Sequence, residues 1–260
     1  MFEKKGVSIS QRRDSILEML KKENKVTVAE LAKIFHTSDA TIRSDLTEME
    51  QTGLLRRVHG GAVSTRKAYY EMSLNDRMNI NMDEKIRIAK ACAAFIEDGD
   101  ALMIDSGTTT RYLARELAER SNLTVVTNSV LITQEFAYNR FVNVILLGGN
   151  LDLQYQFTFG NDTITQLQRY RADKVFISTD GLSVKHGLTT YHHQESDVSR
   201  QMVERAKKVI AVADYSKIGK EGFSNTVPIS SIDVLVTNEY SANKPELDEI
   251  RQKGIVVEEV

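Results

Sequence analysis

The sequence of 260 residues has a single cysteine, Cys92, and no run of 18 apolar residues. A lone cysteine excludes an internal disulfide and a metal site built from cysteines. Without a long apolar run, no helix is expected to span a membrane, and the N-terminal segment has no apolar signal core. We therefore expect a cytoplasmic protein in which Cys92 is a small buried residue rather than a reactive thiol.

The chain also has little net charge, −2 at pH 7, but this charge is unevenly distributed. Residues 1–66 carry a net charge of +3, whereas the rest of the chain carries −5. This small difference favours an anionic partner for the N-terminal part without establishing nucleic-acid binding. The length and the 41% of hydrophobic residues suit one large globular domain or two unequal ones.

Three amphipathic helical patterns open the chain. The first lies in 11–23, and the second, VAELAKIF, follows Thr27, which forms a capping box with Glu30. The third begins after Ser38, a preferred N-cap residue. Because each pattern has one apolar face, the three helices are expected to pack into a small core.

A β-hairpin pattern follows the third helix. Residues 54–58 alternate, His59-Gly60-Gly61 has the chemistry of a hairpin turn, and Ala62 begins a return strand. Three helices and a small hairpin predict a winged helix-turn-helix domain over residues 1–63, in which the third helix enters a DNA groove.

Polar side chains occupy the first turns of the third helix, where a recognition helix meets base edges and phosphates. Any one of them could simply cap the helix or face solvent, but their order in this arrangement favours binding to double-stranded operator DNA. The predicted DNA-binding residues are Ser38, Asp39, Thr41, Arg43 and Ser44 of the helix and Arg56, Arg57 and His59 of the wing.

The pattern changes after the hairpin. Residues 64–82 have no sustained periodicity and are predicted to form a linker, whereas from residue 83 helical patterns alternate with short apolar runs. Such runs are typical of strands buried on both faces, as in a parallel sheet flanked by helices. The sequence thus predicts an α/β domain over residues 83–260 with a mostly parallel sheet. Its expected strands are ALMI (101–104), LTVV (123–126), VNVILL (142–147), KVFIS (174–178), KVIAVA (208–213) and DVLVT (233–237).

Small and polar residues follow the first of these strands. DSGTTT, from Asp105 to Thr110, leads directly into a helical pattern. Ligands of doubly wound sheets bind beyond the carboxyl ends of the strands, and hydroxyls at a helix N-terminus suit phosphate. The motif is neither a GxGxxG dinucleotide pattern nor a P-loop. It is equally compatible with a phosphate site and with an ordinary strand-to-helix turn.

Other strand ends carry similar residues and favour the phosphate site. Asn128, Gly149 and Asp180 each follow a strand, and so does Asp214 with Lys217 three residues later. A lysine in that position can neutralise a phosphate or form a structural ion pair. The predicted effector-binding residues are Asp105, Ser106, Gly107, Thr108, Thr109, Asn128, Gly149, Asp214 and Lys217.

The adjacent His192 and His193 do not predict a metal site. Neighbours on an extended segment point to opposite sides, and no third ligand lies at helical spacing. We expect no metal and no cofactor, and a hydrogen bond from either histidine to the effector stays open.

The run EMLKKENKVTVAELAKIFHTSDATIRSDLTEMEQTGLLRRVHGGA resembles the N-terminal signature of the DeoR family of bacterial transcriptional regulators. The strand-end residues, and GLTT followed by Glu195, resemble the family's C-terminal effector domain, whose fold is similar to ribose-5-phosphate isomerase. The resemblance covers essentially the whole chain and implies a phosphorylated-sugar effector. Ser44 departs from it, since the family usually has a second arginine there, and so does Ser178, where glycine is frequent.

Together these features predict a repressor of a carbohydrate-utilisation operon that a phosphorylated sugar releases from DNA. A homo-oligomer, either dimer or tetramer, is expected because operators repeat their half-sites. Activation in place of repression stays open. The alternative is a sugar-phosphate isomerase-type enzyme with a DNA-binding domain, in which Asp105 or Asp214 would act as the base, but the sequence has no further catalytic signature.

Overall fold

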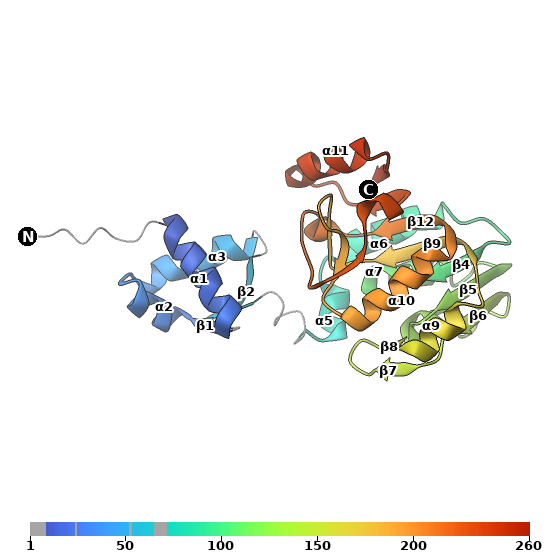
Figure 1. The fold of residues 1–260 in the computed structure, drawn as a ribbon, viewed down its shortest axis with the longest axis horizontal. Coiled ribbons are helices and arrows are strands. Elements are labelled where there is room, and N and C mark those ends of the chain that lie inside the picture. The colour runs from blue at the N-terminus through green and yellow to red at the C-terminus, as the bar shows by residue number, and fades with distance from the viewer. Residues whose placement is uncertain (1–8, 24, 52–53, 65–71) are drawn as a thin grey trace, which may run out of the picture. The chain divides into compact units, whose positions relative to one another are not determined.

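The computed structural model describes residues 9–23, 25–51, 54–64 and 72–260. The chain divides into two compact units, Met1–Met72 and Ser73–Val260, each with its own core (Figure 1). Among the described residues, no helix has the length and apolar character needed to cross a membrane.

The N-terminal unit consists of three helices and a three-stranded antiparallel sheet with the order β1-β3-β2. Residues from every helix and from the sheet form its core, among them Ile16, Leu31, Ile42 and Leu55. The prediction of a winged helix-turn-helix is confirmed. The elements are α1 (Ile9–Glu23), β1 (Lys25–Thr27), α2 (Val28–Ile34), α3 (Asp39–Gln51), β2 (Leu55–Val58) and β3 (Gly61–Ser64).

Side chains fix where α2 and α3 begin. The Thr27 hydroxyl accepts a hydrogen bond from the backbone N–H of Glu30 (3.2 Å), and the Glu30 carboxylate accepts one from the backbone N–H of Thr27 (3.2 Å). Ser38 accepts from the N–H of Thr41 (3.2 Å) in the same way. Between the helices His36 has a φ of 50°, which makes the turn tight.

A seven-stranded parallel sheet lies at the centre of the second unit, with the order β15-β14-β12-β9-β4-β5-β6 (Figure 1). All six predicted strands are present, and β15 is an additional edge strand. The predicted α/β fold with a mostly parallel sheet is confirmed. The strands are β4 (Ala101–Ile104), β5 (Leu123–Thr127), β6 (Val142–Leu146), β9 (Ala172–Ser178), β12 (Ala206–Val212), β14 (Val234–Thr237) and β15 (Val256–Glu259).

Helices cover both faces of this sheet because alternate strand residues are buried on opposite sides. In β4, Leu102 and Ile104 belong to one core, whereas Met103 belongs to the other. The first core includes residues of α6 (Met82–Ala93), α7 (Thr108–Glu116) and α8 (Val130–Glu135), and the second includes residues of α9 (Asn161–Leu167), α10 (His193–Glu204) and α11 (Lys244–Gln252).

Short antiparallel elements surround the main sheet. One is a hairpin, and another is a three-stranded sheet with the order β10-β11-β13. The bounds are β7 (Asn150–Asp152), β8 (Phe157–Phe159), β10 (Gly181–Ser183), β11 (Gly187–Thr190) and β13 (Ser224–Val227), with the 3-10 helices η1 (Tyr215–Lys217), η2 (Ile229–Ser231) and η3 (Ser241–Asn243).

The direction of the sheet's connections reverses between β4 and β9. The chain proceeds from β4 to β5 and β6, then crosses back to β9 on the other side of β4. A hydrogen bond joins the two strand ends, since the Ser178 hydroxyl donates to the carbonyl oxygen of Ser106 (2.6 Å). Ligands of open α/β sheets bind at such a switch point.

The second unit begins earlier than the predicted boundary at residue 83. A short helix, α5 (Leu74–Asn79), is capped by Ser73 and buries Met78 in the core beneath α7. It lies within the predicted linker of 64–82, whose first residue, Ser64, ends β3. Residues 65–71 of that linker lie outside the described residues.

Candidate functional site

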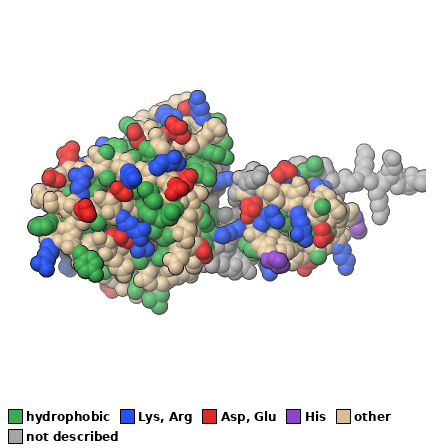
Figure 2. Space-filling view, turned by 180° about the vertical axis from the view of Figure 1, so that it is seen from behind, with side chains coloured by type: hydrophobic (Ala, Val, Ile, Leu, Met, Phe, Trp, Pro, Cys, Tyr) green, Lys and Arg blue, Asp and Glu red, His purple; other side chains and the backbone are tan. Residues whose placement is uncertain are grey.

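The predicted DNA-binding side chains lie on α3 and the hairpin, and most of them face solvent. Thr41 and Arg56 are half-buried. On the visible face of the small unit, basic side chains are interspersed with acidic ones (Figure 2). Their contact with DNA stays a prediction. The exposed ones are Ser38, Asp39, Arg43, Ser44, Arg57 and His59.

Two hydrogen bonds attach the wing to the recognition helix. The Arg57 guanidinium donates from Nη1 to the hydroxyl of Thr47 in α3 (2.8 Å), and the backbone N–H of Arg57 donates to Oε1 of Glu50 (2.7 Å). The wing and α3 therefore present their polar residues from one fixed surface.

A buried carboxylate anchors the opposite side of α3. Asp45 accepts from Nε of Arg12 (2.6 Å) and from Nε of Arg13 (3.0 Å), both in α1. Arg13 also pairs with Glu48 (2.7 Å). These charge-assisted bonds fix the angle of the recognition helix against α1. The sequence pattern did not distinguish Asp45 from an exposed aspartate.

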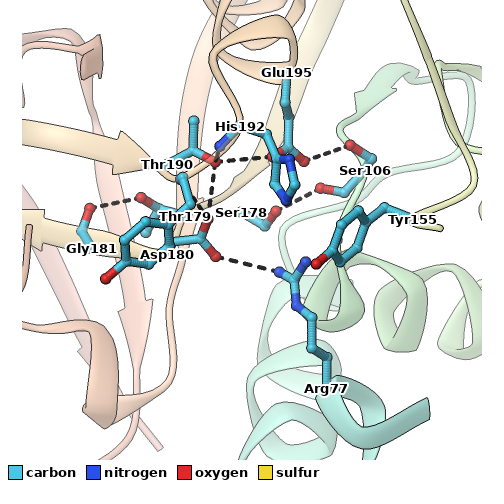
Figure 3. Close-up of polar contacts among 12 residues, drawn as sticks. Arg77, Ser106, Tyr155, Ser178, Thr179, Asp180, Gly181, Thr190, His192 and Glu195 are labelled. Carbon is cyan, nitrogen blue, oxygen red and sulfur yellow. Dashed lines mark hydrogen bonds and ion pairs between the residues drawn. The ribbon is translucent and has the colours of Figure 1, made fainter. Parts of the chain in front are cut away.

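In the second unit a pocket lies at the switch point of the sheet (Figure 3). Its volume is about 350 Å³, including space open to solvent. The loop between β4 and α7 forms one wall. The lining residues are Ser106, Gly107, Thr108, Leu74, Arg77, Met78, Arg111, Ser129, Leu131, Tyr155, Phe157 and Glu195.

One part of the pocket suits an anion. The helix α7 starts at Thr108 with its N-terminus at the pocket, where the helix dipole is positive. Two arginines add full charges, and each is paired with a carboxylate. Arg77 lies 3.3 Å from Asp180, and Nε of Arg111 lies 2.6 Å from Glu135.

Another part of the pocket is acidic. Glu195 in α10 accepts a hydrogen bond from the hydroxyl of Ser106 (2.8 Å), and its Oε2 lies 3.0 Å from the hydroxyl oxygen of Thr190 (Figure 3). Burial, together with the negative charge of Asp180, raises the pKa of Glu195 to about 7. A carboxyl group of this kind can exchange hydrogen bonds with the hydroxyl groups of a ligand.

Asp105 is buried behind this wall and does not line the pocket. Its Oδ2 accepts from the hydroxyl of Ser199 (2.9 Å), while its Oδ1 is buried with no hydrogen-bond partner. Burial, followed by the nearby charge of Glu195, raises the pKa of Asp105 well above its usual range.

Of the predicted effector-binding residues, Ser106, Gly107 and Thr108 meet in the pocket. Thr109 is buried in the first turn of α7 and is not a lining residue. Asn128 donates from Nδ2 to the carbonyl oxygen of Thr158 (3.1 Å) and so joins the end of β5 to β8. These last two side chains are structural neighbours of the pocket.

Gly149, Asp214 and Lys217 are likewise not among the lining residues. At position 149, with a φ of 148°, a Cβ would lie 2.0 Å from the hydroxyl oxygen of Thr163, so glycine is required by close packing. Asp214 accepts from Nδ2 of Asn81 (2.9 Å) and connects η1 to the start of α6. The geometry thus does not support Lys217 as the cation of the pocket, which has Arg77 and Arg111 instead.

Sequence reasoning missed Arg77, Arg111 and Tyr155. Arg77 falls in the predicted linker, and Arg111 is one polar residue in an amphipathic helix, so neither follows a strand end. Tyr155 is in the turn between β7 and β8, two strands of three residues each. The sequence pointed to Glu195, in contrast, because this residue follows GLTT in a pattern that resembles the family.

The two histidines lie in different environments. His192 is buried, with its ring centroid 4.4 Å from that of Tyr155, and burial lowers the pKa of His192. His193 is exposed at the start of α10. Within the described part of the chain, no group of three His, Cys, Asp or Glu side chains is arranged to hold a metal ion.

The raised pKa of Glu195 predicts a specific pH dependence of stability. The folded protein keeps a proton on Glu195 up to about pH 7, whereas the unfolded chain releases it near pH 4.5. The free energy of unfolding should therefore fall as the pH rises through this window. Glu195→Gln should reduce that fall by about 1–3 kcal/mol, since one pKa unit corresponds to about 1.4 kcal/mol. Urea unfolding at pH 5 and pH 7.5 would measure it, and an unchanged difference between the two pH values would contradict the assignment.

The winged helix-turn-helix and the α/β unit with its pocket define a DNA-binding protein with a separate sensor domain. Residues 12–68 match the DeoR-like helix-turn-helix domain, and residues 80–239 match the DeoR C terminal sensor domain. The chain therefore belongs to the DeoR family of transcriptional regulators, as the resemblance predicted.

Curated relatives are similar along most of their length. The HTH-type transcriptional repressor GlcR of Bacillus subtilis is 32% identical over 88% of this chain and 88% of its own. The transcriptional repressor AccR of Agrobacterium fabrum is 32% identical over 96% and 98%. The glycerol-3-phosphate regulon repressor of Escherichia coli is 31% identical over 88% and 90%. These relatives are regulators, so the prediction of a regulator rather than an enzyme is confirmed.

Among solved structures, ribose 5-phosphate isomerase A from Methanocaldococcus jannaschii is similar with a TM-score of 0.40 and 17% identity. The similarity covers 53% of this chain and 54% of the isomerase chain.

Proposed function

We propose that this regulator represses a carbohydrate-utilisation operon, and that a phosphorylated sugar bound in the pocket of the sensor domain lowers its affinity for operator DNA. The protein would act in the cytoplasm, where the operator is. The effector needs to favour one arrangement of the DNA-binding domains over another, and couplings of about 1–3 kcal/mol are typical.

The names of the relatives support repression. GlcR, AccR and the glycerol-3-phosphate regulon repressor are all repressors by name, and the last of these is named after a phosphorylated polyol. The exposed polar residues on α3, with Arg43 among them, support DNA binding in the major groove.

The residues that line the pocket are the observation that supports this class of ligand. Arg77, Arg111 and the start of α7 suit a phosphate group, while Glu195 lies in the same pocket and suits hydroxyl groups. A phosphorylated sugar has both kinds of group. An unphosphorylated sugar has no anionic group that the two arginines could bind.

A homo-oligomer, dimer or tetramer, is part of the proposal. Operators repeat their half-sites, and a reader with one winged helix-turn-helix in each subunit matches that repeat by symmetry. The ligand would then act on the spacing of paired recognition helices.

Thermal shift and operator-release assays test the proposal. The full-length protein would be mixed with glucose 6-phosphate, fructose 6-phosphate, fructose 1-phosphate or ribose 5-phosphate, and in parallel with each free sugar. One phosphorylated sugar should raise the Tm, because at a hundred times Kd a ligand stabilises the folded state by about 2.7 kcal/mol. It should also release operator DNA. Equal effects of the free sugar, or no effect of any phosphate, would contradict the proposed ligand class.

A further inference from the structure

Arg77 links the pocket to the first helix of the sensor domain. It lies in α5, the first helix of the unit Ser73–Val260, and it lines the pocket together with Ser106, Gly107 and Thr108. Its side chain is 18% exposed, so the guanidinium is accessible from the pocket while largely enclosed by protein. A cation in this position is within reach of a group bound at the start of α7.

One contact of Arg77, with Asp180, is longer than a strong ion pair. Its Nη2 lies 3.3 Å from Oδ1 of Asp180, and its guanidinium lies 5.1 Å from the centroid of the Tyr155 ring (Figure 3). Strong charge-assisted bonds between arginine and carboxylate are about 2.7–2.9 Å long and often bidentate. The contact with Asp180 is longer than this, so a phosphate, which offers several oxygens, can compete with Asp180 for the guanidinium.

Asp180, by contrast, is fixed. Its Oδ2 accepts from the hydroxyl of Thr190 (2.9 Å) and from the backbone N–H of Tyr191 (3.1 Å), and its side chain is 5% exposed. These bonds keep the carboxylate in place when the guanidinium moves. A ligand that breaks this ion pair would therefore have to move the Arg77 side chain rather than Asp180.

The C-terminal half of α5, including the main chain of Arg77 itself, is held against α6. The buried ammonium group of Lys85 donates to the carbonyl oxygens of Arg77 (2.5 Å) and Ile80 (2.6 Å). These bonds connect the end of α5 to α6. A change of partner at the Arg77 side chain thus acts on a helix that is held at its C-terminal half and that follows the DNA-binding domain in the chain.

We propose that a phosphate group bound at Ser106–Thr108 takes the Arg77 guanidinium from Asp180, and that this exchange of partners moves α5 and couples the pocket to DNA release. Asp180 is the internal competitor of the ligand. This inference rests on the proposed function, because it assigns roles to two residues toward the phosphate of that ligand.

Opposite effects of two variants distinguish this exchange from a purely structural ion pair. Arg77→Gln removes the cation and should weaken binding of a phosphorylated sugar by about tenfold or more. Asp180→Asn removes the competitor but keeps an oxygen for Thr190 and Tyr191, and should strengthen binding about threefold or more. If the ion pair were purely structural, both variants would instead weaken binding.

The measurement is calorimetric titration of the full-length protein with the sugar phosphate that gives the largest thermal shift among the four named above. Arg115→Gln is the matched control, because Arg115 pairs with Glu135 (3.1 Å) and is not a lining residue. It should bind like the native protein. Operator release should follow the same order, with Asp180→Asn responding at lower ligand concentration and Arg77→Gln at higher concentration.

Each outcome decides the question. If Arg77→Gln does not fold, Arg77→Lys is the substitute variant. It keeps the charge without the planar guanidinium, so its affinity for the sugar phosphate should be lower than that of the native protein but should fall by less than about tenfold. Weaker binding by Asp180→Asn, or native affinity in the Arg77 variant, overturns the exchange while leaving the proposed function intact. If no phosphorylated sugar binds the native protein, the proposed function fails first and the exchange fails with it.

Discussion

Asp45→Ala is expected to unfold the DNA-binding domain and to leave the sensor domain folded. Asp45 is 3% exposed and holds Arg12 at 2.6 Å and Arg13 at 3.0 Å. Without the carboxylate, the buried guanidinium of Arg12 has lost this counter-charge. Removing one partner of a buried ion pair costs about 3–5 kcal/mol, which is a large part of the stability of a small domain.

Calorimetric unfolding of the full-length protein measures this effect. The native protein should show a transition for each core, and in Asp45→Ala the transition of the N-terminal core should be lost or strongly lowered. Operator binding should disappear with it, while a sensor-domain ligand should still raise the Tm of the remaining transition. An unchanged pair of transitions would mean that the ion pairs of α1 and α3 contribute little.

Arg43→Ala is the matched control on the same helix. Arg43 is exposed on α3, so its removal should leave both transitions in place. It should cost about 1–3 kcal/mol of operator affinity if Arg43 makes a bidentate contact with guanine. Weaker operator binding in both variants, with loss of folding only in Asp45→Ala, would distinguish the exposed face of the recognition helix from its buried face.

Most elements of the fold follow from local patterns. The capping box at Thr27, the cap at Ser38 and the six apolar runs each specify an element through neighbouring residues alone, and all of them are present in the structure. The edge strand β15 was missed because its side chains alternate between exposed and half-buried, so it has no continuous apolar run.

The helix α5 could not be predicted with the same rules. Only Met78 of its residues is buried, and the segment is held by contacts distant in sequence, such as Arg77 with Asp180. A six-residue helix has too few turns to show a helical period. The linker prediction was therefore too long at its C-terminal end.

The residues that line the pocket could be predicted from the sequence only in part. Polar residues after buried strands pointed to the loop from Ser106 to Thr108, and these residues do line the pocket. The sequence does not reveal which strand ends lie side by side, and this depends on strand order. β12, followed by Lys217, is separated from β4 by β9, whereas Glu195 and Arg77 reach the pocket from helices.

Gly107→Ala is expected to abolish the response to the effector while leaving operator binding intact. A Cβ at position 107 would lie 2.2 Å from the hydroxyl oxygen of Ser178 and 2.7 Å from its Cβ. Real side chains do not approach so closely, so the loop at the start of α7 must move. This loop forms the wall of the pocket that we propose binds the phosphate (the anion-binding wall), so we expect the affinity for a phosphorylated sugar to fall by about a hundredfold, equivalent to about 2.7 kcal/mol. Gly254→Ala is the matched control, since a Cβ there meets nothing within 4 Å at a similarly positive φ of 86°.

Ser178→Gly should rescue the Gly107→Ala variant, because it removes the two atoms within 3 Å of the new Cβ and leaves only the Thr110 hydroxyl oxygen, at 3.1 Å. Alone, Ser178→Gly loses only the hydrogen bond to the carbonyl oxygen of Ser106 (2.6 Å) and should keep most of the ligand affinity. The rescue is expected to be partial, since the φ of 158° at position 107 still favours glycine. Titration of the two single variants and the double variant with the same sugar phosphate would show the coupling as a double-mutant cycle. If the double variant binds no better than Gly107→Ala, the loss does not arise from the contact with Ser178, and the close approach of β4 and β9 is not what shapes the anion-binding wall.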